Sequence, residues 1–278
     1  MQTWLAVEGS KKTQLGEGPL WDDKNQVLYF VDIEGKNIRR YDPESRREDV
    51  LPAPQRVGSL FLDTDSNLLA ALEDGIYYAD KWKPAHQKIK IKGDRFNDGK
   101  TGPDGCIYAG TIGKAKEAAF YKLTPGGEIS ELFSGITCSN GLDWSLDEKT
   151  MYYIDTPTLK IDAFDFDGTL TNRRTIYEFG SGEGFPDGMC IDMNGILHVA
   201  LWTGRAMVSI DPISGRKIET TSLPSSKITC MAFGGTDMKT MYITIADIDN
   251  GTLLTESLAG QLLSRKYHSP GRVCYRFG

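Results

Sequence analysis

The chain has 278 residues, 40% of them hydrophobic and 25% charged, with 30 glycines and 12 prolines. This length fits either two ordinary domains or one large all-β or barrel domain with a sizeable buried core. Asp and Glu number 38 against 32 Lys and Arg, a net charge of -6, and so acidic a chain disfavours nucleic-acid or anionic-membrane partners. No stretch approaches the roughly 18 uninterrupted apolar residues of a spanning helix, so we expect no membrane insertion.

The N-terminus and the cysteines predict a cytoplasmic protein. The first twelve residues lack the basic head, apolar core and small-residue cleavage site of a secretory signal. The five cysteines are an odd number, lie at least 32 residues apart and form no CxxC pair. This spacing favours free or buried thiols in a reducing compartment over a disulfide framework or a zinc site.

A repeated strand motif divides the chain into six units. Segments of the type LYFVD recur at intervals of 39 to 45 residues, centred on Tyr29, Leu69, Tyr108, Tyr153, His198 and Tyr242. Several are followed by a second alternating strand that ends on Asp, Pro or Gly, as in residues 36–43, 159–168 and 205–215. A period of about 40 to 45 residues is typical of β-propeller blades of four short strands. The sequence therefore predicts an all-β, six-bladed β-propeller forming one domain over residues 1–278.

The two ends of the chain are the candidates for closing the ring of blades. In the usual closure, a strand from one terminus completes the blade built by the other. Residues 4–7 and the VCYRF segment at 273–277 both have strand-like sequences. We therefore expect these two segments to lie side by side in the last blade.

Polar residues precede the repeated strands at one common position. Eleven to thirteen residues before each repeat centre stand Glu17, Val57, Asn97, Asn140, Asp187 and Cys230. Because equivalent positions enter the innermost strand of each blade, these side chains are expected to meet at one end of the central channel. Glu17, Asn140 and Asp187 would present oxygen ligands from three blades, a donor set that hard divalent cations prefer. The alternative is that these are turn formers, since Asn-Gly and Asp-Gly are common turn pairs.

Arg95 and Asn97 enter the third blade at the same height. A guanidinium and an amide there could hydrogen-bond the oxygens of a polyhydroxylated substrate, while the alternative makes Arg95 a salt-bridged surface residue. Asp98, the next residue, could orient a neighbour or a water. His198 stands in a repeated strand and is expected to pack rather than to catalyse. The sequence contains no G-x-S-x-G elbow, P-loop or Rossmann glycine pattern.

Several motifs in unbroken order resemble the regucalcin group of the gluconolactonase and luciferin-regenerating-enzyme family. They are GEGPLW at 16–21, NDGK at 97–100, SNGLDWS at 139–145, YYID at 152–155, DAFDFD at 162–167 and PDGMCID at 186–192. The resemblance implies a six-bladed propeller with one divalent cation (Ca²⁺, Zn²⁺, Mg²⁺ or Mn²⁺) in its channel. It further implies Glu17, Asn140 and Asp187 as metal ligands, Asp187 also as the catalytic acid/base, and Arg95 and Asn97 as substrate contacts.

Two segments depart from the family pattern. The loop after AGT carries Lys114 and Ala115 where the family has acidic residues, and it is several residues shorter before Tyr121. Glu117 is the carboxylate that could substitute there. After AGQLL the chain continues with SRKYHSPGRVCYRFG in place of a Gly-rich strand. The first departure leaves sugar-lactone specificity open, and the second leaves the closure of the last blade open.

Together these features predict a divalent-metal-dependent lactonase acting on a sugar lactone or related cyclic ester. The cation would act as Lewis acid on the lactone carbonyl, and Asp187 would transfer the proton. The alternatives are a non-catalytic calcium-binding regulatory protein, or a phosphotriesterase-like or luciferin-regenerating hydrolase using the same site. We expect a monomer whose partner is the small-molecule substrate, with no nucleic-acid or membrane partner.

Overall fold

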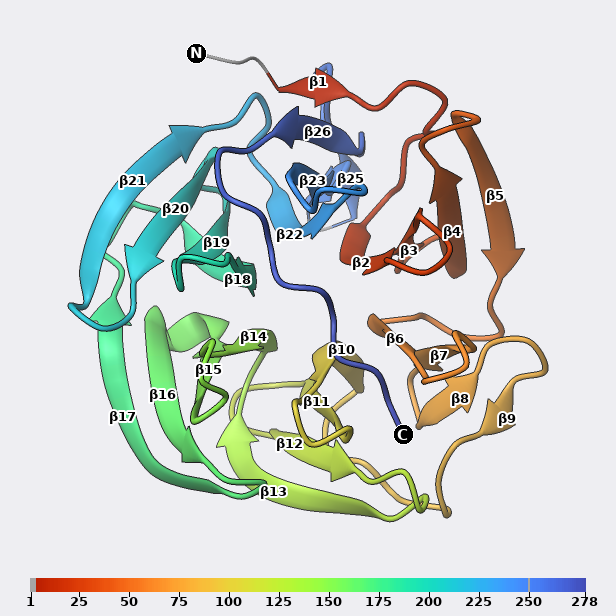
Figure 1. Cartoon of the computed structure of the whole chain (residues 1–278), viewed down its shortest axis with the longest axis vertical. Helices are drawn as coiled ribbons and strands as arrows, with labels where there is room; N and C mark the ends of the chain where they lie inside the picture. Colours follow the sequence, from red (N-terminus) through yellow and green to blue (C-terminus); the bar gives the residue numbers. More distant parts are fainter. Residues whose placement is uncertain (1–3, 250) are drawn as a thin grey trace.

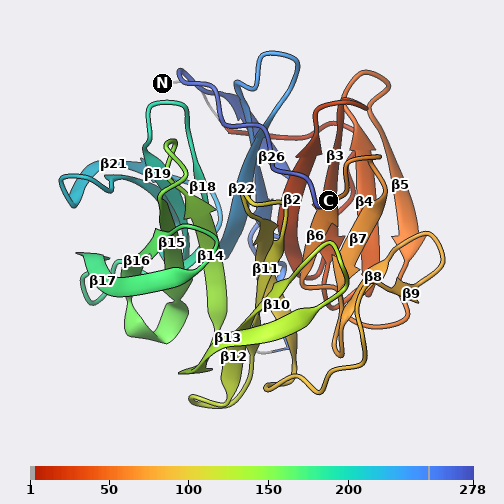
Figure 2. The same ribbon diagram turned by 60° about the horizontal axis from the view of Figure 1, so that its bottom comes forward.

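Six four-stranded antiparallel sheets surround a central channel in the computed structural model, which describes residues 4–249 and 251–278 (Figure 1). The predicted six-bladed β-propeller is confirmed. After a 60° turn, β2 to β5 are seen side by side as a single twisted blade (Figure 2). Within the described residues, no helix has the length and apolar character needed to cross a membrane.

The first three blades are built from consecutive strands, the innermost strand first. They are β2 to β5 (Gly16–Asp22, Val27–Asp32, Asn37–Asp42, Arg47–Pro52), β6 to β9 (Ser59–Leu62, Leu68–Ala71, Ile76–Tyr78, Lys83–Pro84) and β10 to β13 (Arg95–Thr101, Ile107–Ile112, Ala118–Leu123, Ile129–Ile136).

The remaining blades follow the same order until the last. They are β14 to β17 (Ser139–Trp144, Thr150–Asp155, Lys160–Phe166, Leu170–Glu178), β18 to β21 (Phe185–Ile191, Leu197–Trp202, Ala206–Asp211, Arg216–Ser222) and the sixth blade of β22 (Ile228–Gly234), β23 (Thr240–Ile245), β26 (Leu263–Lys266) and β1 (Leu5–Ala6). A small hairpin, β24 (Ile248–Asp249) with β25 (Thr252–Leu253), and the 3-10 turn η1 (Thr156–Thr158) lie in connections.

The repeated sequence motif corresponds to the second strand of each blade. These strands, such as β15 and β19, are buried along almost their whole length because neighbouring blades cover both of their faces. The outermost strands, such as β5 and β17, are mostly exposed. The core therefore lies in clusters between adjacent blades. One such cluster packs the rings of Tyr108, Phe120, Trp144 and Tyr153 between blades three and four.

The last blade closes differently from the prediction. β1 does supply its outermost strand, but it pairs with β26 through Leu5 and Ser264 and through Ala6 and Leu263. It does not pair with residues 273–277. The chain reaches β26 first, and Pro270 and Gly271 follow it and lead the chain out of the sheet.

The last twelve residues, 267–278, form a segment that we call the C-terminal tail. It crosses one end of the channel (dark blue in Figure 1) and contacts all six blades. At its start the tail contacts blade six through Gly271 N and Met238 O at 2.8 Å, and blade five through Met193 N and Pro270 O at 2.8 Å. Its two arginines then form ion pairs, Arg272 with Asp143 of blade four and Arg276 with Asp22 of blade one at 2.9 Å. Its last two residues contact blade two, through Phe277 N and Leu62 O at 2.9 Å, and blade three, through Gly278 N and Gly105 O at 3.2 Å.

The tail lies at the opposite end of the channel from the predicted site. Its contacts are at or just beyond the carboxyl ends of innermost strands, as with Asp22, the last residue of β2. The predicted site residues stand at the amino ends of the same strands. The tail therefore covers one end of the channel, and the candidate site faces the other.

Candidate functional site

A register shift occurs in five of the six innermost strands at the predicted site positions. The shifts fall between Glu17 and Leu20, Phe96 and Gly99, Ser139 and Leu142, Pro186 and Met189, and Ile228 and Cys230. The innermost strand of the second blade, β6, pairs without a shift, and this blade has the apolar Val57 at the position of the polar site residues. Because a β-bulge re-aims side chains and increases the local twist, these shifts turn the polar residues toward the channel.

The Asn-Gly and Asp-Gly pairs at the site are parts of strands rather than turns, so their interpretation as turn formers is wrong. Glycine is needed there because neighbouring innermost strands pass very close to one another. A Cβ added to Gly141 would lie 2.7 Å from Asp187 O, and one added to Gly188 would lie 2.3 Å from Cys230 Sγ. These glycines let three blades bring their polar residues together around the channel.

All five predicted site residues are buried at this end of the channel. The exposed fraction is 9% for Glu17, 7% for Arg95, 8% for Asn97, 5% for Asn140 and 7% for Asp187. Arg95 is thus not the salt-bridged surface residue of the alternative interpretation. The predicted convergence of these positions is observed.

Three buried carboxylates at the site oppose one another's ionisation. Burial, followed by the charge of Asp98, raises the pKa of Glu17 to about 8, although the Gly18 N–H and Arg95 act in the other direction. Burial, then Glu17 and Asp98, raise the pKa of Asp187 well above its usual range. Burial also raises the pKa of Asp98 to about 6, against the opposing charge of Lys100. The site therefore has a surplus of buried negative charge that a bound cation would relieve.

The donor atoms suit a hard divalent cation. Glu17 and Asp187 supply carboxylate oxygens and Asn140 an amide oxygen, the ligand chemistry of Ca²⁺, Mg²⁺ and Mn²⁺. Residues 4–249 and 251–278 contain no group of three or more His, Cys, Asp or Glu side chains arranged to hold a metal ion. The predicted triad has only two such residues, because its third member is an amide.

A chain of hydrogen bonds crosses three blades and holds the two amides. Arg95 Nη1 donates to Asn97 Oδ1 at 2.6 Å, and Asn97 Nδ2 donates to Asn140 Oδ1 at 2.9 Å. Asn140 Nδ2 donates to Thr156 Oγ1 at 2.7 Å, and that hydroxyl donates to Pro186 O at 2.8 Å. Every link has one donor and one acceptor, so the amide oxygen of Asn140 is held in one orientation beside the residue that precedes Asp187.

Thr156 and Cys138 also belong to the site, although the sequence patterns did not single them out. Thr156 directly follows the YYID motif and begins η1, a position from which its hydroxyl reaches both blades four and five. Cys138 lies with its Sγ 3.6 Å from Asn140 Nδ2, and burial raises the pKa of this thiol to about 12. Only the position of Thr156 directly after YYID could have pointed to it.

Two further expectations are confirmed outside the site. His198 is buried at 1% exposure, with Nδ1 2.9 Å from Ser209 Oγ and Nε2 3.4 Å from Asp192. Its ring packs against Phe233 of the sixth blade and Tyr267 of the tail. All five cysteines are free thiols. The divergent loop is exposed from Lys114 to Glu117, and the Glu117 N–H closes a turn onto Lys114 O at 3.0 Å.

Comparisons with known proteins agree with this architecture. Residues 15–247 match the family model described as SMP-30/Gluconolactonase/LRE-like region. The chain is 39% identical over 251 residues to the putative sugar lactone lactonase YvrE of Bacillus subtilis, covering 86% of both chains. It is 37% identical over 254 residues to regucalcin of Xenopus laevis, covering 85% of both. A solved structure of luciferin-regenerating enzyme superposes with a TM-score of 0.86 at 27% identity, covering 99% of this chain and 98% of that one.

Proposed function

Because the chain belongs to the SMP-30/gluconolactonase/LRE-like family, we propose that it is a divalent-cation-dependent lactonase for a sugar lactone or a related cyclic ester. The single observation that carries this proposal is the buried convergence of Glu17, Asn140 and Asp187 from three blades. The 39% identity to a relative named as a putative sugar lactone lactonase supports the substrate class.

Glu17, Asn140 and Asp187 would hold the cation. The chemistry that a bound cation supplies is polarisation of the lactone carbonyl and a lowered pKa of the attacking water. Asp187 would take a proton from that water while the water oxygen forms a bond to the carbonyl carbon. When the ring C–O bond breaks, Asp187 returns the proton to the departing oxygen, and the product is a hydroxy acid.

Arg95 and Asn97 would position the substrate with the hydrogen-bonding capacity that the chain leaves unused, which includes a second bond to Asn97 Oδ1. Asn97 uses both amide hydrogens on Ser139 O and Asn140 Oδ1, so Oδ1 is the atom with capacity to spare. Arg95 uses Nη1 on Phe96 O and Asn97 Oδ1, which leaves Nη2–H groups to donate to substrate oxygens. Substrate hydroxyls would thus meet one acceptor and one set of donors.

The test is hydrolysis of glucono-δ-lactone and related lactones by metal-stripped protein, before and after Ca²⁺, Mg²⁺, Mn²⁺ or Zn²⁺ is added. Asp187→Ala should abolish the turnover that the metal restores. Asp165→Ala, the same substitution at an exposed position on β16, is the matched control and should keep full activity. Unchanged turnover in Asp187→Ala would overturn the assignment.

A second candidate is a calcium-binding protein without turnover, which the 37% identity to a regucalcin favours. The same three ligands would serve it. Tight Ca²⁺ binding by calorimetry, lost in Asp187→Ala, together with no turnover on any lactone would support this candidate. For either function we propose a cytoplasmic monomer without nucleic-acid or membrane partners.

A further inference from the structure

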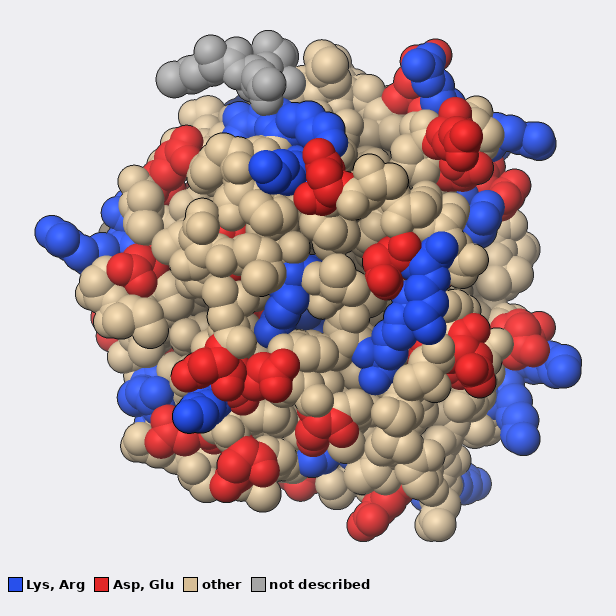
Figure 3. Space-filling view, viewed as in Figure 1, with Lys and Arg blue, Asp and Glu red and all other residues tan. Residues whose placement is uncertain are grey.

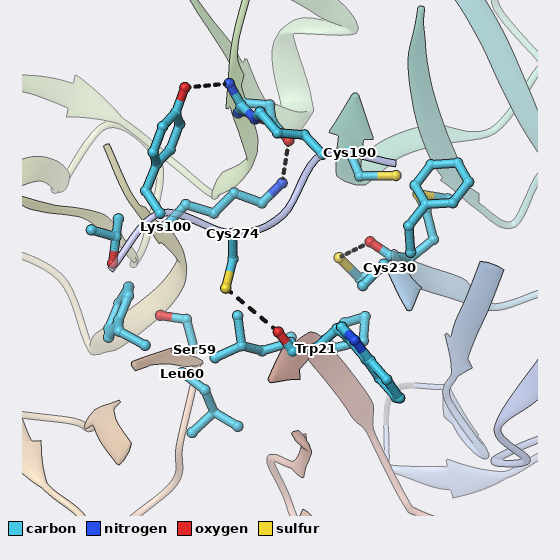
Figure 4. A pocket seen from close by; sticks show the side chains of 18 of the residues that line it. Trp21, Ser59, Leu60, Lys100, Cys190, Cys230 and Cys274 are labelled. Carbon is cyan, nitrogen blue, oxygen red and sulfur yellow. Dashed lines mark hydrogen bonds and ion pairs between the residues drawn. The ribbon is translucent and has the colours of Figure 1, made fainter. Parts of the chain in front are cut away.

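A cavity of about 90 Å³ lies in the channel between the candidate site and the C-terminal tail (Figure 4). Gly18 and Asp98 line it on the side of the site, and Arg272 to Tyr275 line it on the side of the tail. None of Glu17, Arg95, Asn97, Asn140 and Asp187 is among its lining residues. The cavity is therefore lined by other residues than these five, although Asp98 borders both the cavity and the site.

Three lining residues each have a buried polar atom without a hydrogen-bond partner. These atoms are Trp21 Nε1, Ser59 Oγ and Asp98 Oδ2, on residues that are 4%, 1% and 6% exposed. Buried polar groups in folded proteins nearly always have a partner, and leaving one unpaired costs free energy. Three such atoms on residues that line one cavity are groups with which a bound ligand could form hydrogen bonds.

Three charged groups that line the cavity, Lys100, Asp143 and Arg272, are already paired with one another and do not need a ligand. Lys100 Nζ donates to Asp143 Oδ2 at 2.6 Å and to Met189 O at 2.7 Å, and Arg272 donates to the other oxygen of Asp143. Burial alone would raise the pKa of Asp143, but Lys100 and Arg272 outweigh it and hold the pKa below its usual value. The unpaired groups are thus one N–H donor, one hydroxyl and one carboxylate oxygen.

Most of the cavity wall is apolar, including Leu60, Phe61, Ile191, Met231 and Phe233. Apolar walls disfavour a filling of water alone. A single water needs roughly 10–15 Å³ of cavity space, so the cavity, at about 90 Å³, has room for a larger molecule. We propose that the cavity is a second ligand site, for a small neutral molecule with an apolar body and one hydroxyl or amide group.

The tail forms the outer wall of this site. Figure 4 shows Cys190, Cys230 and Cys274 around the cavity, with Cys274 Sγ on the tail donating to Trp21 O at 3.5 Å. Figure 3 shows the face that the tail crosses, with Lys and Arg side chains at its centre. Residues 272–275 of the tail line the cavity on the side of this face.

The experiment titrates the full chain with phenol, which offers one hydroxyl on an apolar ring, and with toluene, which has a methyl group in its place. Methyl NMR of ¹³C-labelled methionines reports binding, because Met231 and Met238 line the cavity whereas Met151 is buried in another cluster. Phenol should shift the Met231 and Met238 signals saturably, with a Kd at least tenfold below that of toluene. The Met151 signal should stay in place.

Two variants locate the binding. Cys274→Trp fills the cavity from the tail and should abolish the phenol shifts, with the unchanged Met151 signal as evidence that the fold is intact. Ser59→Ala keeps the cavity and removes one unpaired hydroxyl, so it should weaken phenol several-fold and leave toluene unchanged. Absence of phenol shifts, equal affinity for toluene, or full binding in a folded Cys274→Trp protein would each overturn the proposal. If Cys274→Trp does not fold, the response of Ser59→Ala decides.

Discussion

Thr156→Val tests whether the hydrogen-bond chain through blades four and five orients Asn140, the proposed metal ligand. Valine has nearly the shape of threonine but removes the hydroxyl that accepts from Asn140 Nδ2 and donates to Pro186 O. Both of those groups then lose their partner in a largely buried setting. The substitution therefore acts on the chain without removing any proposed ligand.

The expected magnitude follows from those two lost bonds. A buried polar group left unpaired costs about 1–3 kcal/mol, and Thr156 is only half-buried, so the free energy of unfolding should fall by about 2–3 kcal/mol. Removing a residue that orients a metal ligand costs roughly 10–100-fold in metal affinity. Urea denaturation measures the first quantity, and calorimetric titration with Ca²⁺ measures the second.

Thr158→Val is the matched control, because it makes the same change two residues later in η1. Thr158 is exposed, and its hydroxyl donates to Asp155 O at 2.7 Å within the turn. We expect a loss of no more than about 0.5 kcal/mol and unchanged Ca²⁺ affinity. If Thr156→Val loses stability but keeps its Ca²⁺ affinity, the chain supports the fold and does not orient Asn140. If neither quantity changes, the energetic argument is refuted.

Three further predictions concern protonation and the tail. In metal-free protein the pKa of Glu17 is raised from 4.5 to about 8, so its contribution to stability is fully present below pH 4.5 and is lost as the pH rises through 8. The urea midpoint measured in EDTA should therefore decrease as the pH is raised from 5 to 8.5. An increase of the midpoint over this range would contradict the prediction. Ca²⁺ affinity should increase over the same range, because Glu17 and Asp187 must release protons to bind it, and calorimetry in buffers of different ionisation enthalpy would detect that release. Phe277→Ala should lower the free energy of unfolding by about 3–5 kcal/mol, because this tail ring is 4% exposed and packs between blades two and three. Val273→Ala, at an exposed tail position, should lower it by less than about 1 kcal/mol in the same denaturation experiment. Equal losses in the two variants would contradict the anchoring role of the ring.

The blades could be predicted because burial imposes a pattern on the sequence. The second strand of each blade is covered on both faces, so segments such as residues 151–154 are continuously apolar or aromatic and recur with the length of one blade. The convergence of Glu17, Asn140 and Asp187 could be predicted from the same repeat, because equivalent positions of successive blades become neighbours around one axis.

The bulges and the hydrogen-bond chain could not be predicted in this way. Asn140-Gly141 has the composition of a hairpin turn, and glycine is required there only because Asp187 O lies 2.7 Å from the point that a Cβ on Gly141 would occupy. The hydroxyl of Thr156 joins Asn140 to Pro186, which is 30 residues further along the chain than Thr156. Such partners depend on how neighbouring blades pack, and a local sequence pattern does not record that.

The tail shows most clearly why a strand-like sequence pattern does not by itself produce a strand. Residues 273–277 alternate as a strand does, yet their hydrogen-bonding groups are used on separate blades, and Arg272 pairs with Asp143 at a separation of 129 residues. A strand in the last blade would have left the buried Asp143 with Lys100 as its one cationic partner, and Asp22 and Asp23 without Arg276. Crossing the channel satisfies these carboxylates together, because the strand ends and the turn that carry them meet at one end of the ring. The same crossing covers that end, so a substrate of the proposed lactonase would reach Asp187 from the opposite end. A molecule in the inner cavity would lie between the carboxylates of the candidate site and the tail.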